Sequence, residues 1–122
     1  MDILATVLQV IVALGLLNVW ILRFNSKTPY RGGNANSMAE EFAAYGLPVA
    51  VMYVVGALKI GSAIALIVGI WFANWAQPAA AVITVLMLAA IAMHIKIGDP
   101  LKKSLPAIGV LIMTVAIFVL HY

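Results

Sequence analysis

The sequence predicts an all-α membrane protein, a bundle of four transmembrane helices, on three observations. Of its 122 residues, 66% are hydrophobic and 9% charged, whereas a soluble domain has roughly 45–50% apolar and 25% charged residues. Four long apolar stretches separate the charges, and within lipid only helices or closed barrels satisfy the backbone. The alternating pattern of barrel strands is absent. We therefore expect one domain, residues 1–122, embedded in a lipid bilayer.

The four predicted helices cover residues 3–22, 47–75, 78–95 and 105–120. The first two provide the ~20 apolar residues that a spanning helix needs. The last two are shorter but long enough for a thin membrane. The first stretch has no basic start, and its basic flank, Arg23, follows it. This pattern favours a spanning helix over a cleavable signal peptide.

The orientation follows from the basic side chains, because six of the seven lie in the connections after the first and third helices. They are Arg23, Lys27, Arg31, Lys96, Lys102 and Lys103. The positive-inside rule places both connections in the cytoplasm and both termini outside. The sequence thus predicts an N-out/C-out, multi-pass protein of the bacterial inner membrane.

The first connection is predicted to contain a short cytoplasmic helix between helices 1 and 2. Ser37 can cap its start, and Glu40 stands three residues later, at the capping-box position. Gly46 is expected to end it, and Leu47 and Pro48 then open the second spanning helix.

Several functions are excluded by residues that are missing. The chain has no cysteine, so it has no disulfide and no thiol redox chemistry. It has no basic run interleaved with aromatic residues, so we expect no nucleic acid partner. It has no nucleophile–base pair, phosphate loop or metal-ligand spacing. We expect a protein that is not catalytic by itself, with no metal and no covalently bound cofactor.

Lys59 is the most informative residue of the sequence. It lies twelve residues past Leu47, so at ~1.5 Å per residue it reaches roughly the middle of the bilayer. A lysine there costs ~2.5–3.5 kcal/mol, and such residues usually face the bundle interior or a wet cavity. Two interpretations stay open. Lys59 is either a tether that pairs with Glu40, Glu41 or backbone carbonyls of the last helix, or a group that binds a ligand.

Other polar residues are candidates for the same site. Gln9 lies at a depth comparable to that of Lys59, and the two could donate hydrogen bonds to a quinone carbonyl. The segment from Glu40 to Tyr45 would complete the lining of such a pocket. Asn18 is expected to bond to the same segment, with packing as its main role.

His94 ends the third helix on the predicted cytoplasmic side. Near Glu40 or Glu41 it could relay protons, although the favoured interpretation is an interfacial side chain. His121 lies at the opposite face, so the two histidines cannot share a metal within one chain.

The second helix also carries small residues at every fourth position, namely Ala57, Gly61, Ala65 and Gly69. Such a stripe lets a neighbouring helix approach closely. We therefore expect helix packing on this stripe, with Lys59 presented on another face.

Six sequence motifs together resemble the DoxX-like family of small four-helix membrane proteins. They are TPYRGG (28–33), EEF (40–42), YGLP (45–48), GALK (56–59), HIKIGDP (94–100) and KSLPA (103–107). The family takes its name from a subunit of an archaeal thiosulfate–quinone oxidoreductase. Some relatives are linked to membrane oxidoreductase complexes, and a distant animal relative is a chaperone for receptor assembly.

The resemblance implies an accessory or assembly subunit of an inner-membrane complex, one that is quinone-linked and redox-active. Its partners would be other membrane subunits or a second copy of the chain. Two alternatives stay open: a stand-alone quinone- or lipid-binding membrane protein, and a small homodimeric transporter. No catalytic residue of the family can be placed in this sequence.

Overall fold

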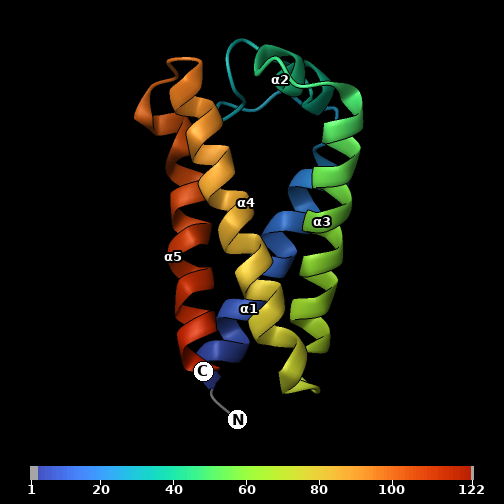
Figure 1. The fold of residues 1–122 in the computed structure, drawn as a ribbon, viewed down its shortest axis with the longest axis vertical. Helices are drawn as coiled ribbons and strands as arrows, with labels where there is room; N and C mark the ends of the chain where they lie inside the picture. The colour runs from blue at the N-terminus through green and yellow to red at the C-terminus, as the bar shows by residue number, and fades with distance from the viewer. Residues whose placement is uncertain (1–2, 122) are drawn as a thin grey trace.

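The computed structural model describes residues 3–121, which form a bundle of four long helices capped at one end by a short one (Figure 1). The long helices are α1 (Ile3–Leu17), α3 (Val49–Val68), α4 (Ala76–Lys96) and α5 (Leu105–Leu120). The short elements are η1 (Asn18–Leu22), α2 (Met38–Ala44), η2 (Ala73–Trp75) and η3 (Leu101–Ser104). The described residues contain no strand, which confirms the all-α fold class.

Each long helix packs against two others. α1 contacts α3 and α5, and α4 contacts the same two helices, so α1 and α4 lie on opposite corners of the bundle. The start of α1 and the end of α5 lie at one end, and α2 covers the other (Figure 1).

Four helical segments are long and apolar enough to cross a membrane: residues 3–22, 49–68, 73–96 and 101–120. This confirms the predicted four-helix membrane bundle. Both charged connections lie at the capped end (Figure 1), where Lys103 of the second connection donates to the carbonyl of Gly33 in the first. The side of the membrane that this end faces stays a prediction.

The second long helix is shorter than predicted: α3 begins at Val49 rather than Leu47 and ends at Val68 rather than Trp75. The chain turns at Gly69, where a Cβ atom would lie 2.9 Å from the backbone nitrogen of Ala76. The start of α4 therefore packs directly against the end of α3.

The short helix of the first connection is present as α2, with the predicted cap. The backbone N–H of Glu40 donates to Ser37 Oγ at 3.2 Å, and that hydroxyl contacts Glu40 Oε2 at 3.4 Å. Gly46 follows the helix with a φ of 76°, a conformation that favours glycine. The Glu40 side chain thus returns to the Ser37 hydroxyl, rather than to the Ser37 backbone as in a capping box.

The best-packed core lies toward the end opposite α2. It consists of buried residues from all four long helices: Val12, Ala13, Leu16, Ala63, Leu66, Ala79, Ala80, Ile83, Met87 and Ile117. Alanines on α3 and α4 allow these helices to approach closely, so little space remains between them.

The prediction of helix packing along the small-residue stripe is wrong for half of the stripe. Ala57 and Gly61 are exposed, and a Cβ atom on Gly61 would meet nothing within 4 Å. Ala65 packs against the core, and Gly69 packs against Ala76. Four residues turn an α-helix by about 400°, so the stripe drifts by about 40° at each step and leaves the packed face.

Candidate functional site

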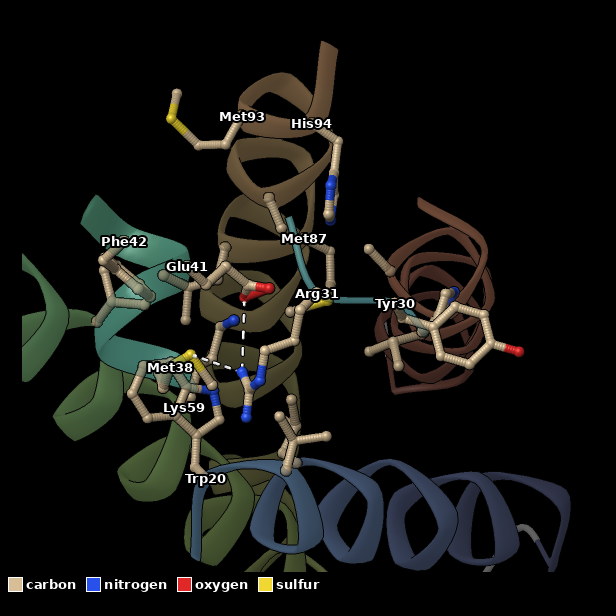
Figure 2. A pocket seen from close by; sticks show the side chains of 18 of the residues that line it. Trp20, Tyr30, Arg31, Met38, Glu41, Phe42, Lys59, Met87, Met93 and His94 are labelled. Atoms are coloured by element: carbon tan, nitrogen blue, oxygen red, sulfur yellow. Dashed lines mark hydrogen bonds and ion pairs between the residues drawn. The ribbon is translucent and has the colours of Figure 1, made fainter. Parts of the chain in front are cut away.

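A cavity of about 780 Å³ lies between the long helices, beneath α2. It is partly open and mainly apolar, and side chains of all four long helices and of α2 line it. Figure 2 shows Glu41 and Phe42 of α2, Lys59 of α3, and Met87, Met93 and His94 of α4 around this space. Its volume falls in the range of small-molecule pockets, which is roughly 300–1,000 Å³.

Lys59 lines this cavity from α3. Its Nζ lies 5.3 Å from the centroid of the Trp20 ring, a distance at which an aromatic face attracts a cation. Within residues 3–121 it forms no hydrogen bond and no ion pair. The tether interpretation therefore finds no support: Glu40 is exposed and contacts Ser37, and Glu41 lies against Arg31.

Trp20 forms one wall of the cavity and is held from two directions. It lies on η1, where α1 continues as a π-helical turn, a distortion that is frequent at functional sites. The missing side chain of Gly56 admits its ring, because a Cβ atom there would lie 2.7 Å from it. Phe42 meets the ring edge-on at 6.0 Å. The indole Nε1 of Trp20 is buried and has no hydrogen-bond partner among the described residues.

Arg31 closes the cavity from the first connection, and only 4% of its side chain is exposed. Its guanidinium donates to the carbonyl of Ser26 at 2.9 Å, to that of Phe24 at 3.2 Å and also to that of Arg23. It also reaches Glu41, with Nη1 3.9 Å from Oε1 (Figure 2). Arg31 thus ties the connection to itself and to α2.

Glu41 Oε2 accepts the backbone N–H of Gly32 at 2.7 Å. A Cβ atom on Gly32 would lie 2.5 Å from the Tyr45 ring, so the connection can approach α2 this closely only because glycine stands here. Each oxygen of the Glu41 carboxylate therefore has a partner other than Lys59.

Asp99 joins the two connections. Its carboxylate lies 2.7 Å from His94 Nδ1, accepts the Gly33 N–H at 3.0 Å and lies 3.7 Å from Lys103 Nζ. Burial disfavours the charged carboxylate, but the hydrogen bonds from His94 and Gly33 and the charge of Lys103 outweigh it and lower the pKa of Asp99. We call this cluster of Gly33, His94, Asp99 and Lys103 the latch.

Tyr45, at the end of α2, packs edge-on against Phe42 and His94. Its backbone oxygen accepts a hydrogen bond from Lys96 Nζ at 3.0 Å. Burial, followed by the negative charges of Glu41 and Asp99, raises the pKa of Tyr45 well above its usual range. The phenol is therefore neutral near neutral pH, and it lines the cavity as a hydrogen-bonding group.

The structure brings only some of the predicted site residues together. Lys59, Glu41, Tyr45, His94 and Asn18 all line the cavity. His94 contacts Asp99 rather than Glu40 or Glu41, so a relay to those two carboxylates is not what the fold provides.

Gln9 does not join Lys59. Its Nε2 donates to the carbonyl of Leu66 at 2.9 Å, and its Oε1 lies 2.9 Å from His121 Nε2. Leu66 is near the end of α3, so Gln9 joins three helices at the uncapped end of the bundle. The expectation that Gln9 and Lys59 hold one ligand together is therefore wrong, because counting residues along separate helices does not fix their relative depth.

The site lies within the part of the chain that is similar to a known protein family. The model of the DoxX-like family matches residues 7–118, which include α2, α3, α4, most of α1 and α5, and the whole cavity lining. The chain belongs to the DoxX-like family. No significant match is found among curated proteins or among solved structures.

Three residues at the site of this DoxX-like protein were not predicted as site residues from the sequence: Trp20, Arg31 and Asp99. From the sequence, Arg31 indicated the topology and formed part of the TPYRGG motif, and it stands directly before two glycines that let the chain fold tightly. Asp99 is the single acidic residue in the second connection and follows His94 by five residues. A lone carboxylate among basic residues beside a helix end is a signal of a local ion pair.

Proposed function

We propose that this DoxX-like protein binds one elongated apolar molecule with a hydrogen-bond-accepting head group, of the quinone or lipid class, in the cavity beneath α2. The observation that carries the proposal is the unpaired Lys59 ammonium on the wall of an apolar cavity of about 780 Å³. Pockets that combine apolar walls with a few polar groups are typical ligand sites.

The unpartnered polar groups support a ligand that accepts hydrogen bonds. Lys59 offers an ammonium, which can only donate. Trp20 adds a buried indole N–H without a partner, which is also only a donor. The apolar side chains of α4 and α5, such as Leu86 and Val110, offer a surface for an alkyl or isoprenoid tail.

The test is to purify the full chain in mild detergent and identify co-purified quinones and lipids by mass spectrometry. We expect Lys59→Met, which keeps the length of the side chain and removes the donor, to lose the bound molecule. Lys102→Met is the matched control, because Lys102 is exposed and lies outside the cavity lining. Unchanged ligand content in Lys59→Met would contradict the proposal.

The prediction of an accessory or assembly subunit concerns partners and stays a prediction. A ligand-binding bundle fits a role beside a quinone-linked enzyme, which is the role that the resemblance of the sequence implies. Co-purification at endogenous expression level tests it. We expect other membrane subunits to accompany the protein, and recovery as a free homo-oligomer alone would contradict this role.

A further inference from the structure

We propose that the head group is an oxyanion, a carboxylate or a phosphate monoester at the end of a long apolar chain, and that Lys59 is its counter-ion. This inference rests on the proposed binding function and narrows its ligand to an anionic amphiphile. It follows from the balance of charges around the cavity rather than from its shape.

The charged residues around the cavity do not cancel. Arg31 forms an ion pair with Glu41, with 3.9 Å between Nη1 and Oε1. Lys103 forms an ion pair with Asp99 of the latch, with 3.7 Å between Nζ and Oδ1. Glu41 and Asp99 also accept the backbone N–H groups of Gly32 and Gly33, which hold both carboxylates at these positions.

Two cations of the lining, Lys59 and Arg23, have no carboxylate oxygen within 4 Å among residues 3–121. Arg23 is exposed at the capped end, where solvent can stabilise its charge. Lys59 lies deeper, half-buried among apolar walls and the face of Trp20. The lining therefore holds more cations than carboxylates, and Lys59 is the cation within the span of α3.

An unpaired charge in a low-dielectric site is unfavourable, and a partner of opposite charge with good hydrogen bonds offsets that cost. A neutral carbonyl head offers Lys59 only a dipole. An oxyanion carries a full negative charge, so its hydrogen bond with the ammonium adds a direct attraction between opposite charges. The cation–π contact with Trp20 holds the ammonium in place but leaves its positive charge uncancelled.

The experiment measures binding by the fluorescence of Trp20, which lines the cavity beside Lys59. The full chain carries Trp71→Phe and Trp75→Phe, so that Trp20 is the only remaining tryptophan. Four probes are titrated at a pH at which the acids are ionised: hexadecanoic acid, hexadecyl phosphate, hexadecan-1-ol and decylubiquinone. The first three share one alkyl chain and differ only in the head group.

We expect at least one of the two anions to bind about tenfold or more tightly than the alcohol and the quinone. A preference for the carboxylate would point to a free fatty acid, and a preference for the phosphate would point to a lipid that ends in a phosphate monoester. Either preference supports the inference.

Variants of Lys59 separate its charge from its hydrogen bonds. Lys59→Gln keeps a donor without a charge and should lose the preference for anions, whereas Lys59→Arg keeps the charge and should retain it. Lys102→Met changes an exposed lysine outside the lining and should behave as the parent does.

The opposite results overturn the inference in distinguishable ways. Equal or tighter binding of the alcohol or the quinone refutes the anionic head group but leaves the proposed binding function in place. Anion preference that survives in Lys59→Gln refutes the role of Lys59 as counter-ion. Failure of all four probes to bind refutes the inference and the proposed function together.

Discussion

The two ends of the bundle are built from similarly apolar helices but are packed differently. At the uncapped end, Ala63, Leu66, Ala80 and Ile83 are fully buried and the helices meet closely. At the capped end, the same four helices enclose a cavity of about 780 Å³. Apolar composition alone therefore does not produce a packed core. The size of the side chains and the position of the charged ones decide where the bundle closes.

The cap replaces packing where the bundle stays open. Arg31 and Glu41 fix the first connection to α2, and Asp99 fixes it to the α4–α5 turn. Directional polar contacts at the rim thus hold the helices at a distance that the apolar walls do not determine. We therefore expect the packed end and the capped end to respond differently to the same kind of substitution.

The largest effect is expected from truncation in the packed end. Leu66→Ala should reduce the free energy of unfolding by about 2–5 kcal/mol, because it leaves a void that close-packed neighbours cannot fill. Leu86→Ala, which borders the existing cavity, should cost less than half as much. Unfolding of both variants in detergent, followed by circular dichroism, measures the difference. Equal losses would contradict the contrast between the two ends.

The second-largest loss of stability is expected from removal of the Asp99 charge in the latch. Asp99→Asn weakens the contacts with His94 and Lys103 and should destabilise the cap by about 2 kcal/mol, since hydrogen bonds to charged groups contribute about 1.5–3 kcal/mol. Limited proteolysis of the first connection reports this opening. Glu40→Gln is the control, because Glu40 is exposed and touches only Ser37. Faster cleavage in Glu40→Gln than in Asp99→Asn would argue against the latch.

Protonation of Asp99 at low pH should also destabilise the cap, but less than Asp99→Asn does. The pKa of Asp99 is lowered in the folded chain, so its contribution to stability is full above the unfolded-state pKa of about 3.9 and is lost as the pH falls through the lower folded value. The cap should therefore be unchanged from neutral pH to about pH 5 and loosen below about pH 4. The amide resonance of Gly33, which donates to Asp99, follows this titration. In Asp99→Asn this acid titration should disappear.

Substitution of Gly56 by alanine tests whether the missing side chain is needed for the position of the Trp20 ring. Gly56→Ala should displace the Trp20 ring and cost about 1 kcal/mol, the low end for overpacking, because the ring borders open space and can shift. Gly61→Ala on the same helix should change stability by less than about 0.5 kcal/mol, since its Cβ would meet nothing. The emission of Trp20 should move in the first variant and stay constant in the second.

The smallest effect is expected between α4 and α5. Thr84 Oγ1 lies 3.1 Å from Thr114 Oγ1 and 2.8 Å from the carbonyl of Ala80 in its own helix. Thr84→Val should cost about 0.6 kcal/mol, a typical value for a hydrogen bond between transmembrane helices. A loss above that of Gly56→Ala would mean that polar contacts, rather than packing, hold this pair of helices.

Much of the fold could be predicted because membrane helices have strong local signals. Long apolar stretches, the Ser37 cap and the placement of basic residues identified the four long helices and α2. The end of α3 was missed because Gly69 turns the chain only through its contact with Ala76. The small-residue stripe was misjudged because a four-residue spacing drifts around a helix.

The site was harder to predict, as Gln9 and Lys59 show. Their positions along separate helices suggested a shared depth, but the offset between α1 and α3 is set by packing across the bundle. Arg31 and Asp99 carried little signal as single residues, since their partners lie in other segments of the chain.

The sequence by itself determined that four apolar helices must cross a bilayer, because lipid offers the backbone no other partner for its hydrogen bonds. It also determined that Lys59 lies within one of them. Only the tertiary structure decided that Lys59 borders a cavity and lacks a carboxylate partner within residues 3–121. The physical reason is that pairing and packing depend on contacts between residues far apart in the chain, such as Gly33 with Asp99 and Trp20 with Gly56.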